Sequence, residues 1–493
     1  MTRIFAAAIA GLLGFGCAGA DPAPAKKGPN VLIILADDLR WDALGCTGHP
    51  YLRTPNIDRL AAEGARFANA FCTTSLCSPS RASILSGLLA HAHGVTDNFT
   101  EFPAGRPSLH ARLQAAGWET AWIGKWHMGE ENDEKRAGFD YWVSHKGQGT
   151  YIDNLFNVNG ERKVLPGYYT SVVTDLAKDY LRRPREKPFF LVVGHKAPHS
   201  PNVPEPQYAR GFDAIDIRYP RTAFNLAGKP KWIEQRLQTW HGIYGPLWGF
   251  RRRFPDASRE GEKAFADFCR AYYATVRSID DSVGQILEAL ARSGQLDDTL
   301  IVFTGDNGFF LGEHGMMDKR TMHEPSIRIP LLVRHPRLAP RGTVVDQQVL
   351  TVDFAPTILE ACGAPPLSDI HGRSMLPLLR GETAGWRKSW FYAYNYEKQF
   401  PYTPNVRGVR TADWKYVRYP HGDGTPDRHG AELYNLRLDP LELRNEAENP
   451  LHQDKVRELR AELDRLMAEA GALPDRMPLD EGVKTTLPDP KIR

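Results

Sequence analysis

Short apolar runs alternate with longer amphipathic stretches along the first 375 residues of the chain. The first run, residues 30–36 (Asn-Val-Leu-Ile-Ile-Leu-Ala), is uncharged and predicts a strand buried on both faces. Similar runs predict strands at residues 120–123, 189–194, 299–304 and 330–333. Helices are predicted between them, at residues 55–63, 80–85, 108–116, 169–181 and 264–293. This order predicts an α/β fold with a large mixed, mostly parallel sheet and helices on both of its faces.

The pattern changes near residue 386, where shorter strands joined by Gly, Asp and Pro turns replace the long alternation. A second, smaller domain with an antiparallel sheet and one helix is therefore predicted. Its strands are expected at residues 390–396, 406–411, 414–419 and 432–436, and its helix at residues 454–470. We divide the chain into a catalytic domain, residues 30–375, and a C-terminal subdomain, residues 376–493. Residues 203–256, rich in Pro, Arg, Trp and Tyr, are an excursion expected to shape a substrate mouth.

The N-terminal residues are typical of a secretory signal. Arg3 precedes an apolar stretch, and Ala18-Gly19-Ala20 offers the small residues that a signal peptidase reads. We expect a signal peptide at residues 1–20, a linker at residues 21–29, and a secreted or periplasmic protein. Lipid attachment at Cys17 is the less favoured alternative. No other apolar stretch reaches eighteen residues, so no membrane span is expected.

Composition narrows the function classes only a little. The 493 residues are 42% hydrophobic and 25% charged, with a formal net charge of +3, which is ordinary for a globular protein. Because there is no basic run with interleaved aromatic residues, a nucleic-acid partner is not expected. The six cysteines are too widely spaced for a disulfide framework or a CxxC metal site. Cys46 and Cys72 could pair in an oxidising compartment, which the sequence leaves open.

Two polar pairs follow predicted strands directly. Asp37 and Asp38 end the first strand, and Asp306 and Asn307 come just after the strand at residues 299–304. Carboxylate and amide oxygens are hard ligands that suit calcium or magnesium better than zinc. Either pair alone is explained as well by a turn or a helix cap. Two pairs at equivalent ends of central strands indicate a divalent metal site, since the carboxyl ends of such strands gather active groups.

The segment Cys77-Ser78-Pro79-Ser80-Arg81 stands at the start of a predicted helix. Ser78 is expected to be the N-cap and Pro79 the first helical residue. Cys77 should then lie at a helix N-terminus, where unpaired N–H groups and the helix dipole favour an anion. The alternative is a buried structural cysteine, which is the commoner fate of a single Cys.

This segment resembles the maturation signal of the type I, formylglycine-dependent sulfatases. The resemblance continues at residues 124–129 (Gly-Lys-Trp-His-Met-Gly), 197–201 (Ala-Pro-His-Ser-Pro) and 315–333, and spans nearly all of the mature chain. It implies an alkaline-phosphatase-like fold, oxidation of Cys77 to formylglycine by a formylglycine-generating enzyme, and one Ca²⁺ ion per chain. The calcium ligands that it implies are Asp37, Asp38, Asp306, Asn307 and the modified side chain of Cys77.

The same resemblance implies a role for each remaining site residue. Arg81 and the metal would keep a hydroxyl of the hydrated aldehyde nucleophilic, while Lys125 and Lys319 would hold sulfate oxygens. His127 would take a proton from the second hydroxyl, and His199 would protonate the departing alcohol. The implied reaction converts a sulfate ester and water to an alcohol and inorganic sulfate.

The substrate is the less defined part. The chain looks most like the glycan sulfatases, N-acetylglucosamine-6-sulfatase-like or iduronate-sulfatase-like, so a sulfated carbohydrate is the expected partner. Asn98, His145 and His323 are candidates for a sugar pocket, or they serve ordinary loop hydrogen bonding. Two other functions stay open: a phosphodiester or phosphonate monoester hydrolase of the same superfamily, and a secreted glycan-binding protein with a degraded site. All implied site positions are intact, which argues against the second.

Overall fold

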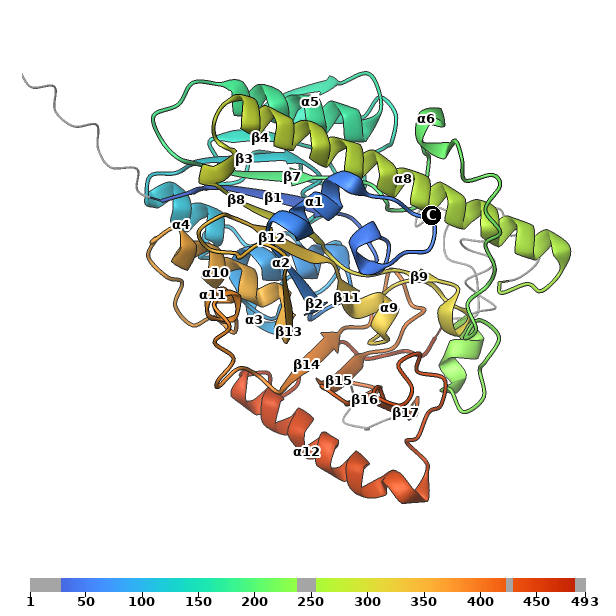
Figure 1. Ribbon diagram of the computed structural model, residues 1–493. Coiled ribbons are helices and arrows are strands. Elements are labelled where there is room, and N and C mark those ends of the chain that lie inside the picture. The colour runs from blue at the N-terminus through green and yellow to red at the C-terminus, as the bar shows by residue number, and fades with distance from the viewer. Residues whose placement is uncertain (1–27, 237–253, 423–428, 484–493) are drawn as a thin grey trace, which may run out of the picture.

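The computed structural model describes residues 28–236, 254–422 and 429–483 (Figure 1). The predicted signal peptide, Cys17 and most of the predicted linker therefore lie outside the described residues, as does part of the excursion at residues 203–256. Within the described residues, no helix is both long and apolar enough to cross a membrane.

An 11-stranded mixed sheet forms the centre of the molecule. Its core is parallel: β1 (Asn30–Ala36) lies between β7 (Phe189–Gly194) and β8 (Thr299–Gly305), and β3 (Glu119–Gly124) pairs with the far side of β7. Every residue of β1 is buried, as its uninterrupted apolar sequence predicts. The predicted α/β fold with a mostly parallel central sheet is confirmed.

Side chains of β1 alternate between two cores because successive residues of a strand point to opposite faces. Leu32 and Ile34 pack with the helices of one face, while Val31 and Ile33 pack with those of the other. The first face carries α1 (Pro55–Glu63), α5 (Tyr169–Arg182) and α8 (Arg259–Arg292) (Figure 1). The second carries α2 (Cys77–Ser86), α4 (Leu109–Ala115) and α10 (Phe354–Ala361).

The outer strands make the sheet mixed. On one side β12 (Leu331–Arg334) runs antiparallel to β8 and to β2 (Ala65–Phe71), and β13 (Thr343–Leu350) runs parallel to β2. The sequence analysis missed β2 and β13, because their polar residues interrupt the apolar runs. On the other side lie β4 (Tyr141–Ser144), β5 (Leu155–Val158) and β6 (Glu161–Val164).

The remaining helices and strands before the small C-terminal sheet are short. They are α3 (Ala90–His93), α6 (Pro206–Ala209), β9 (Phe310–Leu311), β10 (Met317–Asp318), α9 (Glu324–Ile327), β11 (Arg328–Ile329) and α11 (Leu376–Leu379). Cys46 and Cys72 are both free thiols, so the disulfide left open by the sequence does not form in this structure.

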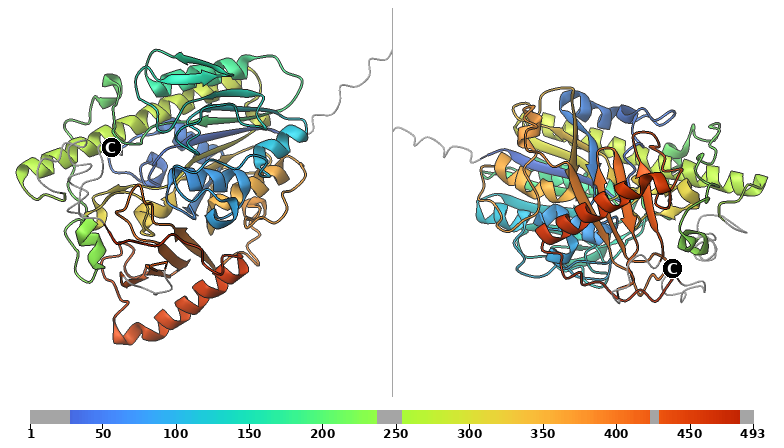
Figure 2. Two further views of the ribbon diagram at one scale, coloured as in Figure 1. Left: turned by 180° about the vertical axis from the view of Figure 1, so that it is seen from behind. Right: turned by 90° about the horizontal axis from the view of Figure 1, so that it is seen from below.

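A four-stranded antiparallel sheet and one long helix follow, as predicted. The strands run in order β14 (Ser389–Tyr394), β15 (Val406–Thr411), β16 (Trp414–Arg418) and β17 (Ala431–Asn435). Helix α12 (Gln453–Glu469) lies across this sheet (Figure 2). It buries Leu459, Leu463 and Met467, which are spaced four residues apart and so share one helical face. The boundary at residue 375 stays a prediction.

Candidate active site

The two polar pairs meet at the carboxyl edge of the large sheet. Strands β1 and β8 pair with Ala36 opposite Gly305, so the residues that follow each strand come side by side. The backbone N–H of Asp38 donates to Asp306 Oδ1 at 3.0 Å, and the Asn307 amide donates to Asp38 Oδ1 at 2.7 Å. These side chains are fully buried, as is Asp37. The sequence analysis expected the four together, and the structure brings them together.

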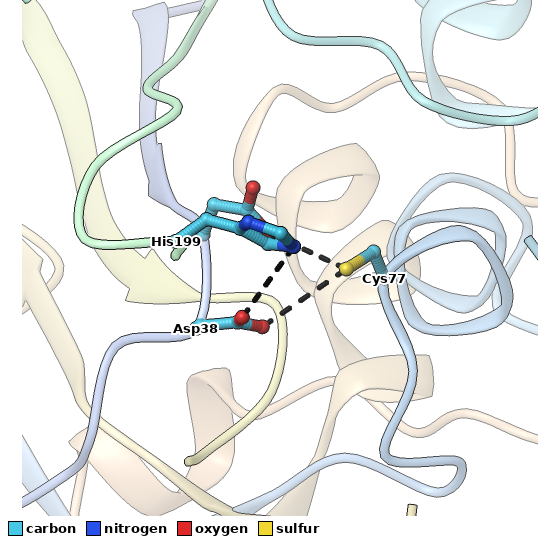
Figure 3. A group of neighbouring side chains, drawn as sticks. Asp38, Cys77 and His199 are labelled. Atoms are coloured by element: carbon cyan, nitrogen blue, oxygen red, sulfur yellow. Dashed lines mark hydrogen bonds and ion pairs between the residues drawn. The ribbon is translucent and has the colours of Figure 1, made fainter. Parts of the chain in front are cut away.

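Cys77 is the first residue of α2 and faces the carboxylates. Its sulfur lies 3.4 Å from Asp37 Oδ1 and 4.0 Å from Asp38 Oδ1. Figure 3 shows Cys77, Asp38 and His199 pointing toward one another from three different segments. The prediction that Cys77 lies at a helix N-terminus is therefore confirmed.

The predicted cap of that helix is wrong. Leu76, with extended backbone angles, is the N-cap, and Ser78 is already helical. Pro79 allows this start because the first turn of a helix needs no N–H donors, so a proline fits at its third position too. The Ser78 hydroxyl instead donates to the carbonyl of His127. Its backbone N–H donates to Asn98 Oδ1 at 3.1 Å.

Three buried cations balance the three carboxylates. Arg81, one turn along α2 from Cys77, donates to Asp306 Oδ2 at 2.8 Å. The Lys125 ammonium pairs with Asp37, and the Lys319 ammonium lies 2.5 and 2.7 Å from the two oxygens of Asp38. Because a buried charge without a partner is costly, this pairing is what allows so many charges inside the protein.

Two glycines bring Lys125 to its place. Gly124 ends β3 with φ +106°, and a Cβ there would lie 2.0 Å from the carbonyl oxygen of Gly194 at the end of β7. Only glycine permits that approach. The Lys125 backbone N–H then donates to Gly194 O at 2.9 Å, which fixes the start of the segment that carries Lys125 and His127.

His199 and His127 complete the group. His199 Nε2 lies 3.7 Å from Asp38 Oδ2, while its Nδ1 is 2.5 Å from the carbonyl of Ser200. A carbonyl can only accept, so Nδ1 carries the proton and Nε2 faces the site. His127 Nε2 lies 2.8 Å from Glu130 Oε1. Burial lowers the pKa of both imidazoles, and Lys125 adds to the shift at His127.

Burial and neighbouring charges shift the pKa values of the three carboxylates in different directions. Burial raises the pKa of Asp38 to about 7, although the Lys319 ammonium opposes that shift. Burial and the charge of Asp37 also raise the pKa of Asp306. Burial acts in the same direction on Asp37, but Lys125 and other cations hold its pKa well below the usual range.

The donor set fits a hard dication. Asp37, Asp38 and Asp306 supply carboxylate oxygens, and Asn307 supplies an amide oxygen. Among the described residues, that Asn307 Oδ1 is a buried atom without a hydrogen-bond partner. An orphaned buried acceptor beside three carboxylates is what a Ca²⁺ or Mg²⁺ site requires.

A family model for sulfatases matches residues 29–364, which hold every residue of this site. The chain belongs to the sulfatase family. A second model, the C-terminal region of N-sulphoglucosamine sulphohydrolase, matches residues 312–469. The protein is thus a sulfuric ester hydrolase.

Individual proteins support the assignment. A relative named N-acetylglucosamine-6-O-sulfatase, from Bacteroides thetaiotaomicron, is 34% identical over 472 residues, which cover 85% of this chain and 82% of the relative. A solved structure of a protein in complex with its substrate D-glucosamine-2-N,6-O-disulfate is 31% identical, with a TM-score of 0.81, and covers 92% of this chain and 99% of the other. A phosphonate monoester hydrolase of Agrobacterium radiobacter shares the fold, at a TM-score of 0.69 and 24% identity, covering 90% and 96%.

Sequence reasoning missed two residues of this sulfatase site. Gln148 Oε1 accepts from the Lys125 ammonium at 2.5 Å, and its amide nitrogen lies 3.2 Å from His127 Nε2. Its own carbonyl accepts from Lys196 at 3.1 Å. Glu130 lies three residues after His127 and orients its imidazole. A carboxylate at that spacing from a histidine is a signal that the sequence analysis could have used. Gln148 sits in an irregular loop, and no pattern in the sequence marks it.

The sugar-pocket candidates have other partners. His145 bonds to the hydroxyl of Tyr169 at 2.8 Å, and His323 pairs with Glu432 at 3.2 Å. Both contacts agree with the alternative of ordinary hydrogen bonding, although each joins segments that are far apart in the sequence. Asn98 stays next to the site through its bond to Ser78.

We predict that Gln148→Ala lowers kcat/KM of the sulfatase about 10-fold, the value of one hydrogen bond to a charged group. The reason is that Lys125 and His127 lose their shared partner. Steady-state kinetics on a chromogenic sulfate ester would measure the change. Gln114→Ala, which removes a surface bond to Asp140, is the matched control. Equal kinetics for the two variants would contradict the positioning role.

Proposed function

We propose that this sulfatase hydrolyses O-sulfate esters of a glycan, using formylglycine made from Cys77 and one bound Ca²⁺ ion. The observation that carries the proposal is the convergence of the Cys77 side chain with four metal-type ligands, two lysines and two histidines. A sulfate ester needs a nucleophile, charge neutralisation and help for the leaving group, and this arrangement can supply all three.

The thiol itself is poorly suited to attack. Burial raises the pKa of Cys77 well above its usual range, so the sulfur is held as an unreactive neutral thiol. Conversion to formylglycine supplies a hydrated aldehyde, with one hydroxyl to attack sulfur and a second that allows the group to be regenerated. The proposal therefore includes a formylglycine-generating enzyme as a partner during maturation. It also includes export of the chain by its predicted signal peptide to a secreted or periplasmic location.

Asp37, Asp38, Asp306 and Asn307 would hold the Ca²⁺ ion, together with the modified side chain of Cys77. An ion held there would supply positive charge that stabilises the anionic sulfate group and the nucleophile. Lys125 and Lys319 bind the other sulfate oxygens with their ammonium groups. Arg81 donates to the Asp306 carboxylate and helps to keep the hydroxyl at position 77 nucleophilic. These positive groups complement the negative charge that develops on the sulfate in the transition state.

Two histidines move the protons. His199 holds its Nδ1 proton against the carbonyl of Ser200 and presents Nε2 to the site. In its imidazolium form, which carries a second proton on Nε2, it protonates the departing alcohol, because an alkoxide is a poor leaving group. His127, held by Glu130 at Nε2, has a buried Nδ1 with no partner among the described residues. We assign to that atom the role of taking a proton from a hydroxyl at position 77.

The substrate class follows from the relatives. One is named an N-acetylglucosamine-6-O-sulfatase, and the solved structure at 31% identity binds a glucosamine that carries a 6-O-sulfate. We therefore propose a 6-O-sulfated glucosamine unit as the substrate. A phosphodiester or phosphonate monoester is the second candidate, because the fold shared with a phosphonate monoester hydrolase accommodates that chemistry.

Mass spectrometry of the tryptic peptide 67–81 from active enzyme tests the modified residue. We expect position 77 to be lighter than Cys, by the exchange of H₂S for one oxygen, and Cys77→Ser to lose activity. Cys72 lies in the same peptide and should remain a thiol, which makes it an internal control. Fully active enzyme with an unmodified thiol at position 77 would overturn the proposed nucleophile.

Removal of calcium tests the metal. Chelation followed by dialysis should lower kcat by about 100-fold or more, because a Lewis acid contributes several kcal/mol to charge stabilisation. Calcium should restore the activity of wild type but not of Asn307→Ala, and metal analysis should show one ion per chain only in wild type. Asp97→Asn, in a surface turn, is the control. Activity that survives complete demetallation would contradict the metal's role.

A substrate comparison separates the two reaction classes. We expect kcat/KM on N-acetylglucosamine 6-sulfate to exceed that on a phosphodiester by about 100-fold or more, the upper range that pocket contacts supply. 4-Nitrophenyl phenylphosphonate and 4-nitrophenyl sulfate provide a matched pair with the same 4-nitrophenolate leaving group. A preference for the phosphorus esters in both comparisons would favour the second candidate.

A further inference from the structure

Three metal-type side chains from separate segments meet at the end of the small sheet. His421 lies just after β16, His429 just before β17, and Asp480 in the tail that follows α12. Each offers one donor atom, and the three atoms lie within 4.8 Å of one another. His429 Nε2 is 2.7 Å from Asp480 Oδ2, and the two imidazole rings lie 6.5 Å apart at 76°.

Burial sets this group apart from a surface ion pair. Asp480 is completely buried and His421 is 8% exposed, while the His429 side chain is 13% exposed. Asp480 Oδ1 accepts from the backbone N–H of Gly482 at 2.7 Å, and Oδ2 faces His429. Among the described residues, the His429 imidazole is the basic group that lies within ion-pair distance of Asp480. A dication between the three donors would compensate the charge of a carboxylate buried at this depth.

The backbone holds the donors in place independently of any ion. Asp480 N–H donates to the carbonyl of His421 at 2.8 Å, so the tail is paired with the end of β16. Asn405 donates to Pro478 O at 2.9 Å, and Arg407 pairs with Asp475 at 2.9 Å. The tail is thus fixed at three points, with the three donor atoms within 4.8 Å of one another.

We propose that His421, His429 and Asp480 form a second metal site, which binds Zn²⁺ and fastens the C-terminal tail to the small sheet. Two imidazole nitrogens and one carboxylate oxygen suit Zn²⁺, with a water molecule in the fourth tetrahedral position. The all-oxygen site at Asp37 suits Ca²⁺ instead, so the chain carries two sites of different selectivity. This second site does not depend on the proposed function.

The tail is connected to the wall of the active site through a short series of contacts. Asn405, which holds Pro478, also accepts from the backbone N–H of Tyr396 at 2.8 Å. The next residue, Glu397, accepts from Arg320 at 2.7 Å, and Arg320 follows Lys319 in the chain. Zinc binding therefore stabilises a segment that supports the wall beside Lys319 and that lies far from Cys77 in the sequence.

Metal binding to the untagged full chain tests the site. The protein is stripped with a chelator, refilled with excess Ca²⁺ so that the first site is occupied, and titrated with Zn²⁺ by calorimetry. We expect one Zn²⁺ per chain in wild type by metal analysis. His429→Ala and Asp480→Asn should each weaken binding by about 100-fold or more, since even changes behind the ligands cost 10–100-fold. Co²⁺ in place of Zn²⁺ should give the visible absorption of a tetrahedral centre.

Proteolysis supplies a readout that concerns the tail itself. Arg476 is exposed in the tail, so trypsin can cut there. Zn²⁺ should slow that cleavage several-fold in wild type and have no effect on Asp480→Asn, which keeps the size of the side chain. His91→Ala is the matched control, because His91 also makes an edge-on ring contact with a second histidine, His371, near the tail. It should bind Zn²⁺ as wild type does.

Other outcomes would overturn the site. One such outcome is that wild type binds Zn²⁺ no better than His429→Ala while circular dichroism shows that both proteins are folded. In that case His429 and Asp480 form only a hydrogen bond, and the three residues bind no metal. If the Zn²⁺ taken up displaces Ca²⁺ one for one, the ion occupies the first site instead.

Discussion

Charge compensation inside the protein is the constraint on which the rest depends. Asp37, Asp38 and Asp306 are removed from water at one edge of the large sheet, where they would repel one another. Arg81, Lys125 and Lys319 meet them, each from a different element, and so the fold can tolerate the cluster. Burial nevertheless raises the pKa of Asp38 and Asp306, so a further positive charge at this edge would stabilise their charged forms. A site built in this way is prepared for a dication and for an anionic substrate group.

The architecture supplies the geometry that the chemistry needs. Parallel strands β1 and β8 end at the same edge, so residues 269 positions apart, Asp38 and Asn307, are in hydrogen-bond contact. Helix α2 begins at the same place and directs its N-terminus and Cys77 toward the carboxylates. The close approach of Gly124 and Gly194 adds Lys125 and His127. Because these groups directly follow strands of the sheet or stand on the first turns of a helix, their positions are set by the fold before a substrate binds.

The small C-terminal sheet contacts the loops that form the active site. Its strand β14 lies next to the segment before α2, where Thr74 donates to the carbonyl of Ala393 at 2.8 Å and Ser75 N–H donates to the Tyr392 hydroxyl at 3.1 Å. Tyr392 in turn donates to the carbonyl of Arg320, beside Lys319. The C-terminal part of the chain therefore supports two sides of the pocket, the loop that leads to Cys77 and the loop that carries Lys319. The proposed zinc site would stiffen the same part.

The sequence alone determined the elements and the chemical types of the site. Uninterrupted apolar runs predicted β1, β7 and β8, because strands buried on both faces tolerate no charge. Short motifs predicted the ligands through a family resemblance. The strands β2 and β13 were not predicted, because polar residues interrupt their apolar runs. Their pairing with neighbouring strands is visible only in the folded sheet. Tertiary structure alone decided which distant groups touch: Gln148 with Lys125, Glu130 with His127, and Asp480 with His429. The physical reason is that hydrophobic periodicity is a local property, whereas charge pairing depends on where separate loops meet once the sheet has formed.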